Sequence, residues 1–226
     1  RTSSGIEALP FGKDYYRTLV KSWTTTDLSP EAIHEIGLKE VARLRSEMEA
    51  VKKQVGFTGT IQEFFEHVRN KPELKPFKVD KLFSLQPKTP FEIRRTEAFR
   101  EQSASAEYVQ GTADGKRPGI FYVPIPDVTA YNYYADEDLF LHEAIPGHHF
   151  QISLQQENDK LPDFRKFNWF GAYGEGWALY TESLGKELGL YDDPYQYFGM
   201  LGSEMHRAIR LVVDTGIHAK GWTREQ

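Results

Sequence analysis

Four side chains that could hold or use a metal ion occur within eight residues of the chain. They lie in the segment DLFLHEAIPGHHFQ, residues 138–151, and are His142, Glu143, His148 and His149. A His followed by Glu, with a second His later in the helix, is the arrangement by which zinc peptidases hold the metal and place a general base beside its water. The apolar run that precedes them indicates a buried helix. This segment is therefore the candidate active site.

The spacing of these histidines differs from that of His-Glu-x-x-His, in which the imidazoles lie four positions apart. Here Pro146 takes that position, and the next histidines come six and seven positions after His142. On a helix of about 3.6 residues per turn, neither could share a metal with His142 without distortion. Pro146 lacks an amide, and Gly147 permits unusual dihedral angles. A bulge at 145–147 is predicted to swing His148 back to the metal. The alternative is that both later histidines flank a helix end.

A second segment, GAYGEGWALYTESLG, carries two glutamates seven positions apart. Glu175 and Glu182 therefore lie on one face of the predicted helix, together with Leu179. Inward carboxylates need a partner, and a zinc ion would supply it. We predict that Glu175 is the third ligand and that Glu182 orients a ligating His. The alternative is that Glu182 is solvated and Glu175 belongs to a helix start at Gly174.

The composition narrows the class of protein. The chain has 226 residues, of which 39% are hydrophobic, so it can bury a sizeable core. Its net charge of −5, without a basic aromatic cluster, argues against a nucleic-acid surface. The sequence contains no run of about 18 apolar residues, so no membrane-spanning helix is predicted. The absence of cysteine leaves His and carboxylate side chains as metal ligands.

Both ends of the sequence resemble points inside a longer chain. It starts at Arg1, and Thr223 and Gln226 have the spacing of a capping box for a helix that does not follow. We expect a single catalytic portion, residues 1–226, from the C-terminal part of a longer protein. Within it, residues 1–90 are predicted to form a helical scaffold, and residues 91–226 a small sheet with the zinc-site helices.

Two helices are expected in the scaffold. Ser29 is a predicted N-cap with Pro30 at the first helical position, and apolar residues then recur at helical intervals. His34 is placed on the charged, solvated face of this helix. Thr60 and Glu63 form the capping box of a second helix. The Lys- and Pro-rich segment 71–90 is interpreted as a linker or lid.

The sheet is predicted just before the histidine segment. FEIRRTE, SAEYVQ and IFYVPI read as β-strands, which indicates two to four strands. Pro124 would restrict the last of them to an edge. Such an edge could bind a substrate backbone by strand addition, or it could be an ordinary edge protected by proline.

The last full helix is predicted to open at Asp193–Pro194, to run to about Thr215 and to end at Gly216. His218 would follow on a loop, where it could donate a hydrogen bond to an oxyanion. Arg207 or Arg210 could grip the C-terminal carboxylate of a substrate. The alternative is that these arginines pair with Glu204 and Asp214, the latter by an Arg210–Asp214 ion pair.

Longer motifs resemble a known family. HEAIPGHHFQ, EGWALYTE, RLVVDTGIHAKGWTREQ and KRPGIFYVP are similar to segments of the bacterial family called domain of unknown function 885, from about Phe11 to Gln226. Its members resemble zinc metallopeptidases of the largely helical gluzincin type. The predicted helices and strands indicate a mainly α fold with a small β-sheet (α+β), and the resemblance implies a zincin-like helical catalytic domain.

The resemblance also assigns roles to residues. It implies His142, His148 and Glu175 as zinc ligands and Glu143 as the base, with His148 favoured over His149. His218 matches a downstream His that assists the transition state. A helper tyrosine is left open among four residues, of which Tyr122 is taken as substrate-binding: Tyr122, Tyr131, Tyr133 and Tyr134. Three further residues are expected to lie behind the ligands without binding the metal themselves: His149, Glu182 and Asp214.

The function expected from these observations is a zinc-dependent peptidase of carboxypeptidase or oligopeptidase type, with a peptide as substrate. Zn²⁺ would polarise a water and Glu143 would take its proton. The alternative is a non-catalytic zinc-binding scaffold or peptide-binding module, closed by His148, His149 and Glu175 together. A third reading is a chain that binds zinc but needs its missing N-terminal part to act. A bacterial periplasmic or exported location is favoured over the cytoplasm.

Overall fold

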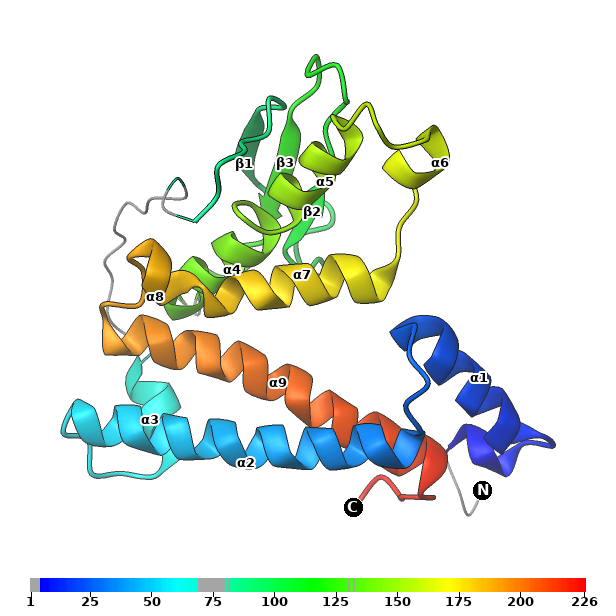
Figure 1. Cartoon of the computed structure of the whole chain (residues 1–226). Coiled ribbons are helices and arrows are strands. Elements are labelled where there is room, and N and C mark those ends of the chain that lie inside the picture. Colours follow the sequence, from blue (N-terminus) through cyan, green and yellow to red (C-terminus); the bar gives the residue numbers. More distant parts are fainter. Residues whose placement is uncertain (1–4, 69–79, 81, 130, 132) are drawn as a thin grey trace. The chain divides into compact units, whose positions relative to one another are not determined.

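The structure is a computed structural model that describes residues 5–68, 80, 82–129, 131 and 133–226. The chain divides into two compact units, here called unit 1 (residues 1–58 and 201–226) and unit 2 (residues 59–200). Figure 1 labels the elements along the chain. Their bounds are η1 Ile6–Ala8, α1 Gly12–Thr24, α2 Pro30–Gln54, α3 Ile61–Val68, β1 Phe91–Arg95, β2 Glu107–Val109, β3 Gly119–Val123, η3 Tyr133–Ala135, α4 Asp136–Glu143, α5 His148–Gln156, α6 Asp163–Lys166, α7 Gly171–Ser183, α8 Gly185–Leu188 and α9 Pro194–Ala219.

The predicted fold class is confirmed: the described chain is mainly helical with one small mixed sheet, an α+β arrangement. The two units differ from the predicted division at residue 90. The reason is that the later part of α9 packs on α2 in unit 1, where a Cβ on Gly37 would lie 2.8 Å from the side chains of Leu211 and Val212. Of the described helices, none combines the length and apolar character that a membrane crossing requires.

Helix α2 begins as its sequence predicts. The Ser29 side chain accepts a hydrogen bond from the amide of Ala32 at 3.2 Å, and Pro30 is the first helical residue. The apolar stripe faces inward, with Leu44 and Met48 almost completely buried. The second capping box is also confirmed, because Thr60 and Glu63 exchange hydrogen bonds between side chain and backbone.

The placement of His34 on the solvated face of α2 is wrong. His34 is 3% exposed, and its Nδ1 lies 3.0 Å from the Val212 carbonyl and 2.9 Å from the Thr215 hydroxyl. Its ring also meets Trp222 edge-on. His34 thus ties α2 to the end of α9, a contact between residues far apart in the sequence that no local pattern reveals.

The sheet has three strands in the order β1-β3-β2. Strand β1 pairs with β3 in parallel, with Ile93 opposite Phe121, and β2 pairs antiparallel with β3, with Tyr108 opposite Phe121. The predicted strands are confirmed, but β3 is the central strand and not an edge. Pro124 lies just beyond the last residue of β3, Val123, so its missing amide removes no hydrogen bond between the strands.

The end of α9 also differs from the prediction. The helix continues past Gly216 to Ala219, so His218 lies in its last turn and not on a loop. A Cβ on Gly216 would lie 2.3 Å from the Trp222 ring. This glycine therefore makes room for a tryptophan and does not stop the helix.

Half of the predicted linker or lid, residues 71–90, lies outside the described residues. Its final part is anchored to the end of α5. The Glu157 carboxylate accepts hydrogen bonds from the amides of Lys88 and Thr89 at 2.8 Å and from the Thr89 hydroxyl at 3.0 Å. This anchor fixes the chain immediately before β1.

Candidate metal centre

The histidine segment folds as two short helices separated by a break. Helix α4 ends at Glu143 and α5 begins at His148, with residues 144–147 between them and a cis peptide bond at Ile145–Pro146. The predicted bulge inside one helix is therefore a complete interruption. Gly147 packs against the end of α4 so closely that a Cβ would lie 1.8 Å from the His142 carbonyl oxygen. Only glycine fits this close approach.

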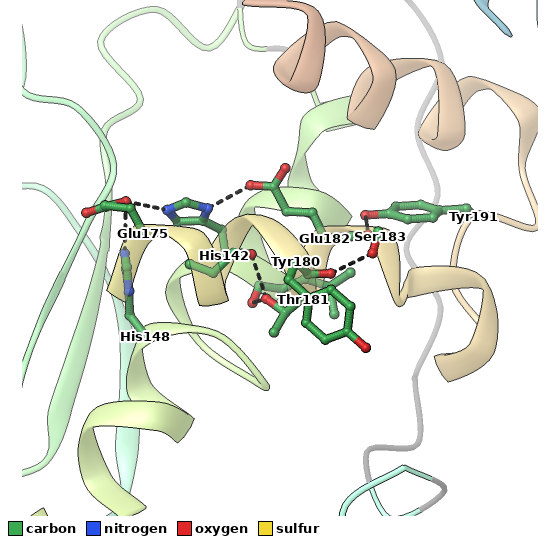
Figure 2. A network of polar contacts seen from close by, with 10 residues as sticks. His142, His148, Glu175, Tyr180, Thr181, Glu182, Ser183 and Tyr191 are labelled. Carbon is green, nitrogen blue, oxygen red and sulfur yellow. Dashed lines mark hydrogen bonds and ion pairs between the residues drawn. The ribbon is translucent and has the colours of Figure 1, made fainter. Parts of the chain in front are cut away.

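The break brings three predicted ligands together. Ligand atoms of His142, His148 and Glu175 lie within 4.8 Å of one another. The Glu175 Oε2 is 3.5 Å from Nε2 of His142 and 3.6 Å from Nε2 of His148, and Figure 2 shows both rings directed toward it. The two imidazole rings are nearly perpendicular, with centroids 4.8 Å apart. Helices α4, α5 and α7 thus each contribute one donor to a common point.

These donors fit a zinc ion in type, and the separations of Glu175 from the two imidazole nitrogens fit as well. Two imidazole nitrogens and one carboxylate oxygen form a common donor set of catalytic zinc sites. Ligand atoms about 2.0–2.1 Å from a tetrahedral zinc lie about 3.3 Å apart, close to the separations of 3.5 and 3.6 Å seen here. Such separations are long for direct hydrogen bonds. Three protein ligands also leave a position for water.

His142 is held from its other side by Glu182. The His142 Nδ1 donates to the Glu182 carboxylate at 2.7 Å (Figure 2). Glu182 is 1% exposed. This hydrogen bond fixes the orientation of the ring and points Nε2 toward Glu175, the position from which it could bind a metal. The alternative that Glu182 is solvated is wrong, because the α7 face carrying it packs against α4. Within the described chain, Nδ1 of the buried His148 has no such partner.

Glu143 lies beside the cluster. It is 7% exposed, and burial raises the pKa of its carboxyl while the nearby His142 and His148 act in the opposite direction. A carboxylate whose pKa is raised toward the working pH is a better proton acceptor and donor in turn. Glu143 is thus placed for acid–base chemistry next to the candidate ligands.

His149 is engaged elsewhere. It is 1% exposed, its Nδ1 lies 2.9 Å from the Tyr108 hydroxyl, and its ring packs on Phe91. Burial lowers its pKa to about 4, so the imidazole is neutral near pH 7. The His149 side chain therefore joins α5 to the sheet, and the described ligand cluster does not include it.

The tyrosines considered as helpers are spread over unit 2. Tyr122 is half-buried on β3 with the Arg100 guanidinium over its ring, 4.8 Å from the centroid. The Tyr131 hydroxyl donates to Asp136 at 2.7 Å, and Tyr134 is buried in η3. These contacts do not single out a helper, and Tyr122 as a substrate contact stays a prediction.

Four other predicted site residues belong to unit 1: His218, Arg207, Arg210 and Asp214. The His218 Nδ1 accepts a hydrogen bond from the Ile6 amide at 3.0 Å. The predicted Arg210–Asp214 ion pair is wrong: among the described residues no ion pair joins these two side chains, and the Asp214 carboxylate accepts a hydrogen bond from the Tyr16 hydroxyl. Glu204 pairs with Arg43 of α2 at 2.6 Å. Helical spacing indicated the nearest charges but not the partners that other helices bring. The proposed roles of His218 and the arginines in substrate binding stay predictions.

Sequence reasoning missed two residues that hold the break. The Trp177 indole donates to the Pro146 carbonyl at 2.7 Å, and the Thr181 hydroxyl donates to the Leu141 carbonyl at 2.9 Å. The two residues lie four positions apart on α7, which places them on one face of the helix. This spacing was the only sign in the sequence that they act together.

A cavity of about 880 Å³ lies alongside α5, α6 and α7 in unit 2. Its lining includes Phe83, Phe150, Tyr173 and Trp177. On α7, Tyr173 and Trp177 share one face, and Glu175, two positions from each, lies on the opposite face. The cavity is therefore separate from the ligand cluster.

The metal-free centre is expected to lose stability as pH rises. Burial alone would lower the pKa of His142, but the Glu175 and Glu182 carboxylates outweigh it and raise the pKa to about 9. The pKa of a histidine in the unfolded chain is about 6.5. The contribution of protonated His142 to the free energy of unfolding is therefore fully present below pH 6.5 and is lost as pH rises through 9. We expect a loss of about 1–3 kcal/mol, reduced by the solvent exposure of Glu175. Urea unfolding with a chelator at several pH values measures it, and a flat or rising profile would contradict this account.

Comparisons with known proteins add a family and a related structure. A family model described as "Bacterial protein of unknown function (DUF885)" matches residues 1–226, the family whose motifs the sequence resembles. The crystal structure of a candidate lipoprotein from Colwellia psychrerythraea is similar, with a TM-score of 0.89 and 35% sequence identity. The similarity covers 100% of this chain and 43% of that one, so the chain spans less than half the length of this relative. A search of curated proteins found no match.

Proposed function

Because the chain belongs to the bacterial family of unknown function called domain of unknown function 885, its activity has to be argued from its own site, and we propose that it is a zinc-dependent peptidase. The observation that carries this proposal is the convergence of His142, His148 and Glu175 beside the buried carboxyl of Glu143. A hydrolase of this kind needs a metal held by a few protein ligands and a carboxylate that can exchange a proton with water.

The residues have separate roles in this proposal. His142, His148 and Glu175 would hold Zn²⁺, and Glu182 would keep His142 in the ligating tautomer. When bound, the ion would serve as a Lewis acid that lowers the pKa of water. Glu143 takes a proton from the water that attacks the scissile carbonyl carbon, and it returns a proton to the leaving nitrogen. Its raised pKa favours both transfers.

The contacts of His149 weigh against the rival function of a closed zinc scaffold. That scaffold would need His149 as a fourth protein ligand. The His149 Nδ1 faces the Tyr108 hydroxyl and its ring lies against Phe91. The three remaining donors correspond to the ligand number of catalytic sites and not to the four of structural sites.

The finer assignments belong to the same proposal. We infer a peptide substrate from the chemistry of the site and an exported location from the similarity to a protein described as a candidate lipoprotein. Fractionation of the native bacterium would test the location. A carboxypeptidase or an oligopeptidase would use the same ligands and the same base.

Removal of zinc should abolish peptide cleavage. The purified chain is expected to hold one zinc ion and to cleave a peptide mixture, as followed by mass spectrometry. Chelation should lower the rate at least about 100-fold, because a Lewis acid contributes several kcal/mol to the transition state. Returning one equivalent of zinc should restore the rate.

Two results would contradict this proposal. Full cleavage after verified zinc removal would exclude the metal mechanism. One tightly bound zinc without any cleavage would favour the scaffold instead.

A further inference from the structure

The break between α4 and α5 deprives two carbonyls of their helical partners. In a continuous helix, the Leu141 carbonyl would accept from the amide of Ile145, and the His142 carbonyl from the amide of residue 146. Pro146 has no amide to give. Among the described residues, the Ile145 amide makes no bond to Leu141. A buried carbonyl left in this way needs another donor.

Helix α7 supplies that donor to the first side of the break. The Thr181 hydroxyl, which is completely buried, lies 2.9 Å from the Leu141 carbonyl and 2.7 Å from that of Ala178. The Ala178 carbonyl already belongs to the helical ladder of α7. The Leu141 carbonyl is therefore the one that depends on the hydroxyl. Thr181 directly precedes Glu182, the residue that contacts His142 (Figure 2).

The other side of the break is held by the same face of α7. The Trp177 indole Nε1 donates to the Pro146 carbonyl at 2.7 Å. Leu141 directly precedes the candidate ligand His142, and Pro146 comes two residues before His148. Each hydrogen bond therefore fixes the backbone next to one imidazole. Helix α7 itself carries the third ligand, Glu175.

We propose that Trp177 and Thr181 are positioning residues of the metal centre: they hold both ends of the interrupted segment at the distance at which His142 and His148 meet Glu175. This inference rests on the proposed metal centre and adds how the chain builds it. Without these donors the same three ligands remain, but the backbone that orients two of them is released. The expected loss is in metal affinity and in coordination geometry.

The test removes each hydrogen-bond donor with a small change of the side chain. Thr181→Val deletes the hydroxyl, and Trp177→Phe deletes the indole N–H but keeps an aromatic ring. Thr181→Ser restores a hydroxyl, and Tyr180→Phe is the matched control on the exposed face of α7. The measurements are the zinc dissociation constant, by competition with a chromophoric chelator, and the visible spectrum of the Co²⁺-loaded protein.

We expect the zinc dissociation constant to rise about 10- to 100-fold for Thr181→Val and Trp177→Phe, the range found when groups behind metal ligands are lost. Their Co²⁺ spectra should change, whereas Thr181→Ser and Tyr180→Phe should match the wild type. Unchanged zinc affinity and spectra in both donor-deleted variants would overturn the proposal, even if their melting temperatures fall. If Thr181→Val does not fold, Trp177→Phe decides alone.

The outcome also separates this inference from the proposed function. A wild-type chain that binds zinc and cleaves peptides, together with unaffected variants, would remove only the positioning role. A wild-type chain that binds no zinc would remove both.

Discussion

Glu143→Gln is expected to lower kcat/KM for peptide hydrolysis by about 10²–10⁴-fold while one zinc ion still binds. The amide has nearly the shape of the carboxyl but cannot take a proton from water. Glu143 is buried and its pKa is raised, so no solvent group would replace it easily. The measurement is a steady-state rate on a cleaved peptide, with the zinc content determined on the same sample.

The matched control is Glu187→Gln, the same chemical change at an exposed position of α8. It should leave both rate and zinc content unchanged. If Glu143→Gln cleaves as fast as the control, Glu143 is not the base. If it loses zinc as well, the loss of activity would report on the metal centre and not on proton transfer.

His148→Ala and His149→Ala should have different effects, although the two residues are adjacent and both are buried. His148→Ala removes a ligand and is expected to weaken zinc binding by more than about 100-fold, beyond the effect of losing a group behind a ligand. His149→Ala should keep zinc binding. It should instead destabilise the fold by about 2–3 kcal/mol, because the Tyr108 hydroxyl loses its partner and a cavity opens beside Phe91.

A chelator competition assay and urea unfolding of the metal-free proteins measure these two effects. The reverse pattern, in which His149→Ala loses zinc and His148→Ala retains it, would show that the ligand set is wrong. Loss of zinc in both variants would restore the closed scaffold as the better description of the site.

Features with local causes could be predicted from the sequence. Ser29 and Pro30 mark the start of α2 because a cap acts on its own first turn. The strands were found for the same reason, since alternation and glycine turns are properties of short segments. The glutamates seven apart on α7 were predicted to share a face, and both meet His142. The expected family is confirmed, whereas the likeness to gluzincin peptidases stays a prediction.

Features that depend on distant partners could not be predicted. The burial of His34 is due to carbonyl and hydroxyl partners on α9, 178 and 181 positions away. Strand β3 is central because β1 pairs with it in parallel on one side and β2 antiparallel on the other. The residues of IFYVPI contain no pattern that indicates this pairing. The Pro-Gly pair indicated a distortion, but its form depends on Trp177 and Thr181, which approach from α7.

The burial of the Glu182 carboxylate bears on how the proposed centre would take up a metal ion. Glu182 contacts His142, and the pKa of the His142 imidazole is raised to about 9. In the metal-free protein this imidazole therefore carries a proton at neutral pH. If the centre binds zinc as proposed, loading would be an exchange of cations, in which a dication enters and a proton leaves. The site would then gain one unit of positive charge instead of two, and the Glu175 and Glu182 carboxylates would have a counterion both before and after the metal binds.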